Sequence, residues 1–185
     1  MRTNFSFLLN LALALIFFLI LIYLVLPSPK FPIAPPDAVQ SLEDADTESI
    51  QRRAYFTNYN REEILRHYED TLGQVLIIGI RLPSFRLNYT PEEAYTLIRD
   101  QTRSTFLEEI VHPGRESIFV NGFIPKVDKD DIWYKGVHYK LKLTVKYVPS
   151  NEKIRIIIFS LAFLLLIFIF KEFLRSMKRL AKEIL

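Results

Sequence analysis

The residues whose types could perform catalysis or bind a metal are few and widely spaced in this chain of 185 residues. The sequence contains no cysteine, which excludes a catalytic thiol and a cysteine-ligated metal. Its five glycines form no phosphate-binding loop, and neither His-Glu-x-x-His nor Gly-x-Ser-x-Gly occurs. We therefore expect a protein that is not an enzyme and that uses no cofactor or metal. A cleft with converging, strongly perturbed ionisable groups would reopen the enzyme interpretation.

The three histidines, His67, His112 and His138, fall in different predicted elements. Glu63 and His67 are four residues apart in a predicted helix, so both lie on one face. Two ligands are fewer than the three or four of a typical zinc site, which favours a surface pair. His112 precedes Pro113, and we expect it to serve the geometry of a turn.

Glu108 and Glu109 are neighbours in a predicted strand, so their side chains point to opposite faces and cannot act as a paired acid and base. A carboxylate on the covered side of a sheet needs a cationic partner. We expect a structural salt bridge or, alternatively, a small polar recognition site. The candidate partners are Arg99, Arg103 and Arg115.

Two almost purely apolar runs, residues 5–26 and 154–170, flank a segment of ordinary globular composition. As a helix the first run is about 33 Å long, enough to cross a bilayer. It is longer than the apolar region of a signal peptide and lacks a small-residue cleavage site, so we expect a retained anchor. The second run is apolar on every face, which favours a membrane span over a buried core helix.

The second span is expected to continue as a basic amphipathic helix, residues 171–185. This tail is interpreted as a topology signal or, alternatively, as a contact with the membrane surface or a partner helix. Its basic residues are Lys171, Arg175, Lys178, Arg179 and Lys182. By the positive-inside rule, both termini are cytoplasmic and the central domain is extracytoplasmic. The expected partners are the lipid bilayer and a protein or a second copy of the chain.

The basic charge is confined to the tail, since residues 27–155 carry 18 basic and 19 acidic residues. This balance argues against nucleic-acid binding by the outer domain. An exported domain without cysteine also fits a bacterial envelope better than an animal cell surface.

The expected organisation is a cytoplasmic N-terminus, a span, a linker, a folded domain, a second span and the tail. Their bounds are residues 1–4, 5–26, 27–50, 51–150, 151–170 and 171–185. The linker has five prolines among residues 27–36 and is acidic beyond them, which predicts a stiff, extended spacer.

The domain is predicted to be α+β, with two helices on one face of an antiparallel sheet. Asn60 and Glu63 form a capping box that opens the first helix. In the last strand lysines alternate with apolar residues, which predicts one buried and one wet face. The predicted helices are residues 60–71 and 90–103, and the predicted strands are 53–58, 75–82 (central), 105–111, 117–124, 132–134 and 137–148.

One stretch, residues 102–117 followed by 119–123, resembles uncharacterised two-span envelope proteins of bacteria. The resemblance extends over about residues 51–149. That group has no assigned activity, so the resemblance implies a bacterial source and no site residue.

These observations predict a membrane-anchored, non-enzymatic module whose outer domain mediates protein interaction or self-association in an envelope assembly. The alternative is a two-span sensor that couples an outer ligand-binding domain to the cytoplasmic tail. The long second helix motivates that alternative.

Overall fold

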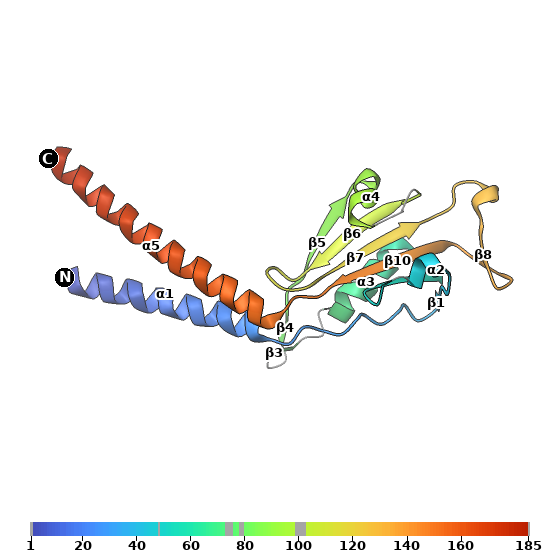
Figure 1. Ribbon diagram of the computed structural model, residues 1–185, viewed down its shortest axis with the longest axis horizontal. Coiled ribbons are helices and arrows are strands. Elements are labelled where there is room, and N and C mark those ends of the chain that lie inside the picture. Colours follow the sequence, from blue (N-terminus) through green and yellow to red (C-terminus); the bar gives the residue numbers. More distant parts are fainter. Residues whose placement is uncertain (1, 48, 73–75, 78–79, 99–102, 185) are drawn as a thin grey trace. The chain divides into compact units, whose positions relative to one another are not determined.

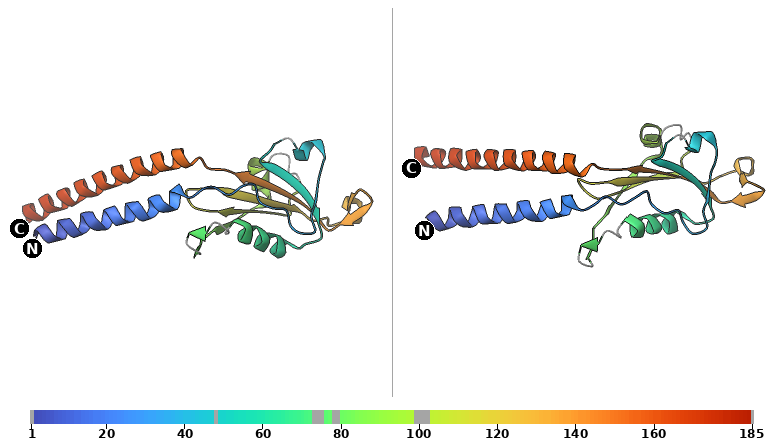
Figure 2. Two further views of the ribbon diagram at one scale, coloured as in Figure 1. Left: turned by 90° about the horizontal axis from the view of Figure 1, so that it is seen from below. Right: turned by 60° about the horizontal axis from the view of Figure 1, so that its bottom comes forward.

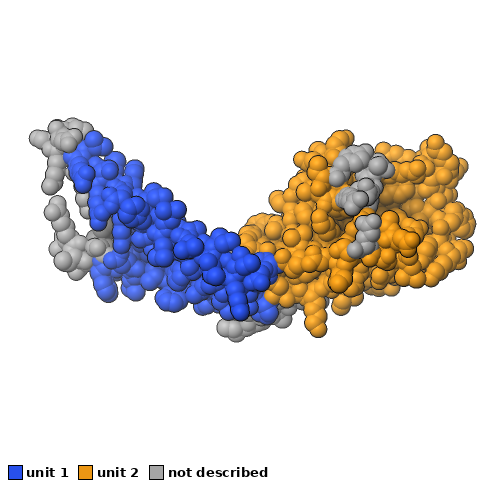
Figure 3. All heavy atoms as spheres, in the orientation of Figure 1, with its two compact units in different colours: residues 1–27, 150–185 blue, residues 28–149 orange. Residues whose placement is uncertain are grey.

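The computed structural model describes residues 2–47, 49–72, 76–77, 80–98 and 103–184 (Figure 1). The chain divides into two compact units, which Figure 3 distinguishes by colour. The first unit comprises Met1–Pro27 and Ser150–Leu185, and the second comprises Ser28–Pro149.

The first unit consists of two long helices that run side by side, α1 (Arg2–Val25) and α5 (Glu152–Ile184), as Figures 1 and 2 show. The ring of Phe17 packs between two rings of α5, with centroids 5.4 Å from Phe159 and 5.1 Å from Phe163. By length and composition both helices could cross a membrane. The prediction that the second apolar run and the basic tail form one uninterrupted helix is confirmed.

The second unit is an α+β domain built on a six-stranded antiparallel sheet, as the sequence predicts. Strand β10 lies inside the sheet between β2 and β7, and β5 forms an edge that the sequence does not predict. In sheet order the strands are β1 (Val39–Gln40), β2 (Arg52–Thr57), β10 (Leu141–Val148), β7 (Ser117–Phe123), β6 (Phe106–Val111) and β5 (Phe85–Tyr89).

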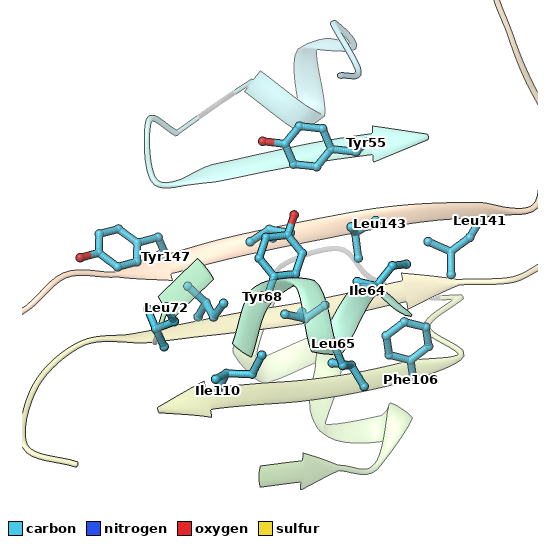
Figure 4. Packing of buried hydrophobic residues seen from close by; sticks show 13 residues of the cluster. Tyr55, Ile64, Leu65, Tyr68, Leu72, Phe106, Ile110, Leu141, Leu143 and Tyr147 are labelled. Carbon is cyan, nitrogen blue, oxygen red and sulfur yellow. The ribbon is translucent and has the colours of Figure 1, made fainter. Parts of the chain in front are cut away.

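Helix α3 (Arg61–Leu72) covers one face of this sheet (Figure 4). The predicted capping box is present: the Asn60 amide donates to the Glu63 carboxylate at 2.8 Å, and the Glu63 amide donates to the Asn60 side chain at 3.0 Å. One side of the helix packs against this face of the sheet and forms part of the hydrophobic core. Its buried residues are Ile64, Leu65, Tyr68 and Leu72.

The second predicted helix differs from expectation in length and position. A single 3-10 turn (Pro91–Glu93) leads into α4 (Ala94–Leu97), and residues 99–102 lie outside the described part of the chain. Helix α4 packs against Leu107, whereas α3 packs against Phe106, and successive strand residues point to opposite faces. The expectation that both helices share one face is therefore wrong, because an apolar helical pattern does not specify which face of a sheet it covers.

The apolar run at residues 75–82 does not form a central strand. Leu76–Ile77 (β3) and Ile80–Arg81 (β4) pair with each other outside the main sheet, and residues 75, 78 and 79 are not described. The positions beside β10 are taken by β2 and β7. A short apolar run identifies a paired segment but not its partner, which explains the error.

Strand β10 has the predicted alternation, but its second face is partly covered. On that face the Lys142 ammonium lies 2.8 Å from the Asp46 carboxylate, and the Lys146 ammonium donates to the Leu97 carbonyl at 3.0 Å. Helix α2 (Asp44–Thr47) and α4 supply these partners, so the expectation of a wet face is corrected. The apolar residues face α3 and are buried: Leu141, Leu143, Val145 and Tyr147.

The proline-rich segment belongs to the second unit instead of forming a spacer before it. The Ser28 hydroxyl donates to Glu116 at 3.0 Å, and the Tyr147 hydroxyl donates to the Pro29 carbonyl at 2.7 Å. Farther along the chain β1 adds an edge strand to β2. The segment is extended as predicted, but it lies along the domain because its carbonyls and side chains find partners there.

Candidate functional site

A β-hairpin, β8 (Ile132–Tyr134) and β9 (Val137–Tyr139), is separate from the main sheet and projects from one end of it (Figure 1). Its turn residues, Lys135 and Gly136, have φ angles of 51° and 79°. Two consecutive positive φ angles are the requirement of a tight type I′ turn, whose twist matches the twist of the strands. The two residues between the predicted strands 132–134 and 137–148 thus close a well-defined hairpin.

An aromatic cluster holds the hairpin on the domain. The Phe56 ring of β2 stacks on Tyr134 at 4.4 Å and lies 5.8 Å from Tyr139, centroid to centroid. Ile132 is buried in the same cluster, and the Tyr134 hydroxyl accepts a hydrogen bond from the Leu42 amide at 3.3 Å. Each aromatic pair contributes about 0.5–1.5 kcal/mol beyond its burial. The hairpin is therefore a fixed projection on a small core of its own.

Trp133 points away from this cluster and is 66% exposed. It pairs with His138 across the hairpin, with ring centroids 5.2 Å apart, and His138 lies 3.5 Å from the Asp131 carboxylate. Val137, at the tip, is 50% exposed. Leaving a large aromatic ring in water sacrifices its burial energy, and tryptophan is over-represented at the centres of protein interfaces. The hairpin thus presents an exposed aromatic side chain, Trp133, on strands that the aromatic cluster holds in place.

The hairpin lies at the end of the domain opposite to both chain connections. Strand β10 begins beside the hairpin and ends at Val148, which pairs with Ser117 at the start of β7. Ser28, the first residue of the domain, hydrogen bonds to Glu116 at that same end. An eight-residue strand is about 25 Å long, so about one strand length separates the start of β10, beside the hairpin, from the end where both connections lie.

Two open cavities adjoin the base of the hairpin, with volumes of about 440 and 360 Å³. Ile124 lines both, and the smaller one also contains Lys126 and Lys129. In the smaller cavity Arg103 donates to Asp130 at 3.1 Å. The smaller cavity is thus lined by charged side chains of both signs and by the apolar residues Phe123 and Ile124, a composition that suits contact with a partner surface.

Glu108 is 1% exposed and lies on the α3 face of β6. It accepts a hydrogen bond from Arg61 Nε at 2.7 Å, and Arg86 Nε lies 3.5 Å from its second oxygen. Neither arginine is among the partners that the sequence nominates. Arg61 begins α3 and Arg86 lies on β5, so their proximity depends on the tertiary fold.

Glu109 lies on the opposite face and accepts a hydrogen bond from the Tyr89 hydroxyl at 2.7 Å. That bond, together with burial and the negative charges of Glu109 and Glu93, raises the pKa of Tyr89 to about 12. Tyr89 therefore stays protonated and acts as a structural donor over the physiological range.

A buried ionic cluster closes the β6–β7 turn. Glu116 is fully buried: its Oε1 accepts a hydrogen bond from Arg115 at 3.0 Å and lies 2.9 Å from His112 Nδ1, and its Oε2 accepts a hydrogen bond from Ser28. Burial alone would raise the pKa of Glu116, but the hydrogen bonds from His112, Arg115 and Ser28 and the charge of Arg115 hold it below its usual value. His112 thus lies in the turn that the sequence assigns to it.

The structure places the remaining nominated residues apart from one another. Arg103 pairs with Asp130, Arg115 pairs with Glu116, and Arg99 lies outside the described residues. His67 contacts the Ile33 carbonyl at 2.9 Å. Of the tail residues, Lys171, Arg175 and Arg179 are exposed on α5, and the side chains of Lys178 and Lys182 are not described.

Sequence reasoning locates the hairpin turn but does not single out Trp133 as an exposed residue. Strand alternation places Trp133 on the face opposite Ile132 and Tyr134, and this was the available indication. Which face packs on the domain depends on Phe56, a residue remote in sequence. Comparison with protein-family models, with curated proteins and with solved structures finds no match to this chain.

Proposed function

We propose that this chain is a two-span membrane protein whose domain, residues 28–149, binds a protein partner or a second copy through the β8–β9 hairpin. The domain faces outward in a bacterial envelope, and both termini are cytoplasmic. Two apolar helices and the five basic residues of the tail support this placement. The protein acts by holding a partner, without catalysing a reaction.

The observation that carries this proposal is the exposure of Trp133 on a hairpin fixed by Phe56 and Tyr134. Both chain connections leave the other end of the domain, about one strand length from the end of the sheet that carries the hairpin. The chain connections therefore do not cover Trp133, and the hairpin is accessible to a partner protein.

Site-specific photocrosslinking in cells tests the interaction. A benzophenone amino acid replaces Trp133 in the full-length protein, and a matched control carries it at Ile50, which is 90% exposed elsewhere on the domain. We expect a discrete adduct from position 133 that is absent from position 50. In the position-133 protein, Val137→Asp should weaken that adduct without lowering the amount of protein. Identical adduct patterns at both positions, or none at either, would contradict the proposal.

The absence of native cysteine makes the topology directly testable. Ile50→Cys and Ser176→Cys each create a single thiol, one on the domain and one on the tail. In intact cells a membrane-impermeant maleimide should label only Ile50→Cys, and Ser176→Cys should react after permeabilisation. The reverse pattern would invert the orientation.

A second candidate, the sensor, is favoured by the connection between β10 and α5. Residues 149–151 alone separate Val148 of the interior strand from Glu152 of the continuous helix. A shift of β10 on ligand binding would pass directly to the tail. This candidate predicts that Ser176→Cys crosslinking between copies changes with a ligand of the outer domain, whereas the interaction module predicts a constant yield.

A further inference from the structure

A cavity of about 300 Å³ opens between α1 and α5, within the first unit. Its walls are apolar, with Leu13 and Phe17 from α1 and Phe163 and Ile167 from α5. Asn10 and Lys171 join this lining near one end, and Ser160 is the third polar residue of the lining. An apolar trough with a cation near one end has the chemistry of a lipid site.

The Arg155–Leu24 hydrogen bond gives a common reference point on the two helices, from which the positions of Asn10 and Lys171 along the helix pair can be counted. Lys171 lies about 24 Å along α5 from Arg155, and Asn10 lies about 21 Å along α1 from Leu24. Both therefore lie near the same end of the helix pair, within reach of one boundary of a hydrocarbon layer about 30 Å thick. A lysine stem can extend its ammonium from this depth to the headgroups.

Neither group is satisfied by the parts of the protein that the structure describes. Among these residues the Asn10 side chain makes no hydrogen bond, and Lys171 makes no ion pair. Glu172, the acidic residue next to Lys171, pairs with Arg175 instead. An amide and an ammonium at the edge of hydrocarbon are costly unless a polar partner binds them. Basic pockets between transmembrane helices on the cytoplasmic side are typical binding sites for anionic lipid headgroups.

We propose that this cavity binds an anionic phospholipid of the cytoplasmic leaflet. Lys171 pairs with the phosphate, the Asn10 amide donates to a glycerol or ester oxygen, and one acyl chain lies against Phe163 and Phe17. This inference rests on the membrane placement proposed above. The helix pair offers an internal comparison, because a second groove of about 240 Å³ shares Leu13, Phe163 and Ile167 but has a wholly apolar lining.

Native mass spectrometry of the full-length protein, extracted from membranes in a non-ionic detergent, tests the proposal. The protein is offered equal amounts of phosphatidylglycerol and phosphatidylcholine with identical acyl chains. We expect wild type to retain the anionic lipid at least fivefold better, the factor that corresponds to about 1 kcal/mol for one lysine at the headgroup level. Lys171→Gln should abolish this preference, and Lys171→Arg should keep it.

Two further variants distinguish a specific site at Lys171 from nonspecific attraction of anionic lipid by the basic residues of the tail. Arg175→Gln removes a neighbouring cation that does not line the cavity and should preserve the preference. Asn10→Leu should reduce retention of both lipids while leaving their ratio unchanged, because ester oxygens are common to both. Equal retention by wild type, or equal losses in Lys171→Gln and Arg175→Gln, would overturn the lipid site.

The remaining outcomes also decide between the proposals. A dimer that excludes lipid would assign the groove to a second copy and overturn the lipid site. Glycerol phosphate competing as well as the lipid would show a headgroup-only anion site and would also overturn it. Recovery of wild type in buffer without detergent would overturn the membrane placement and the lipid site together, whereas a membrane-extracted protein without preference overturns the lipid site alone.

Discussion

The Arg155 guanidinium caps the end of α1: its Nε donates a hydrogen bond to the Leu24 carbonyl oxygen across 2.6 Å, and its Nη2 donates to Leu26. The last carbonyls of a helix have no amide partner within the helix and carry its partial negative charge. Arg155 is 6% exposed, so water does not compete strongly for this contact. Arg155, in the first turn of α5, thus joins the two long helices.

Replacing Arg155 by methionine should destabilise the helix pair. The variant keeps the apolar stem but leaves the Leu24 carbonyl without its donor, and hydrogen bonds to charged groups contribute about 1.5–3 kcal/mol. We expect a lower thermal midpoint for the detergent-solubilised protein and more rapid proteolysis between α1 and the domain. Lys153→Met, at an exposed position two residues earlier, is the control and should behave as wild type. Equal effects of both variants would refute the capping role.

The Arg61–Glu108 pair should show an asymmetric response to mutation. Arg61→Met leaves a carboxylate that is 1% exposed with Arg86 as its remaining cation, and breaking a buried pair in this way costs about 3 kcal/mol. Glu108→Gln should cost less, because the Arg61 side chain is 42% exposed and can be hydrated. The double variant should be more stable than the sum of the two losses implies, which thermal unfolding of all four proteins measures. Strict additivity would show that the two side chains are not coupled.

The buried Glu116 cluster should make stability fall in acid. Because hydrogen bonds to His112, Arg115 and Ser28 hold the folded pKa of Glu116 below the ordinary value of 4.5, the unfolded chain binds a proton more readily. The stabilisation is therefore complete above about pH 5 and is lost as the pH falls through 4.5 toward the folded pKa.

Glu116→Gln should be less stable than wild type at pH 7, and its thermal midpoint should decline less between pH 6 and pH 3.5. Glu92→Gln, at an exposed carboxylate, should retain the acid response of wild type. Asp46, whose pKa is lowered by its bonds to Lys142 and Ser41 despite burial, maintains part of the acid response in every variant. An unchanged acid response in Glu116→Gln would contradict the role of the cluster.

The sequence predicts correctly those features that depend only on residues close together in the chain. The Asn60–Glu63 capping box, the Lys135-Gly136 turn and the alternation in β10 each depend on residues close in sequence, and all three are present. The face that α4 covers and the partner of the run at residues 75–82 depend on which strands occupy the centre of the sheet. No periodicity encodes that choice.

The candidate site was harder to predict for the same reason. The Glu108 partners come from α3 and β5, respectively 47 and 22 residues away in sequence, so proximity along the chain pointed to the wrong arginines. Trp133 acquires its exposure from the packing of Tyr134 on Phe56. The presence of two helices that could cross a membrane, in contrast, follows from length and composition alone.

Gly122 should be intolerant of even a methyl group. It pairs with Phe106 across β6 and β7, and a Cβ atom added there would lie 2.1 Å from a carbon of the Phe106 ring. That ring is 4% exposed in the main core and cannot move aside freely, and overpacking of this kind costs about 1–3 kcal/mol. Gly122→Ala should thus lower the thermal midpoint of the domain, and adding Phe106→Leu should restore part of the loss, since leucine leaves room for the methyl group.

Gly136→Asn is the matched control, because Gly136 has no atom within 4 Å and asparagine tolerates its φ of 79°. If Gly122→Ala melted like Gly136→Asn, the close approach of Gly122 to Phe106 would be refuted.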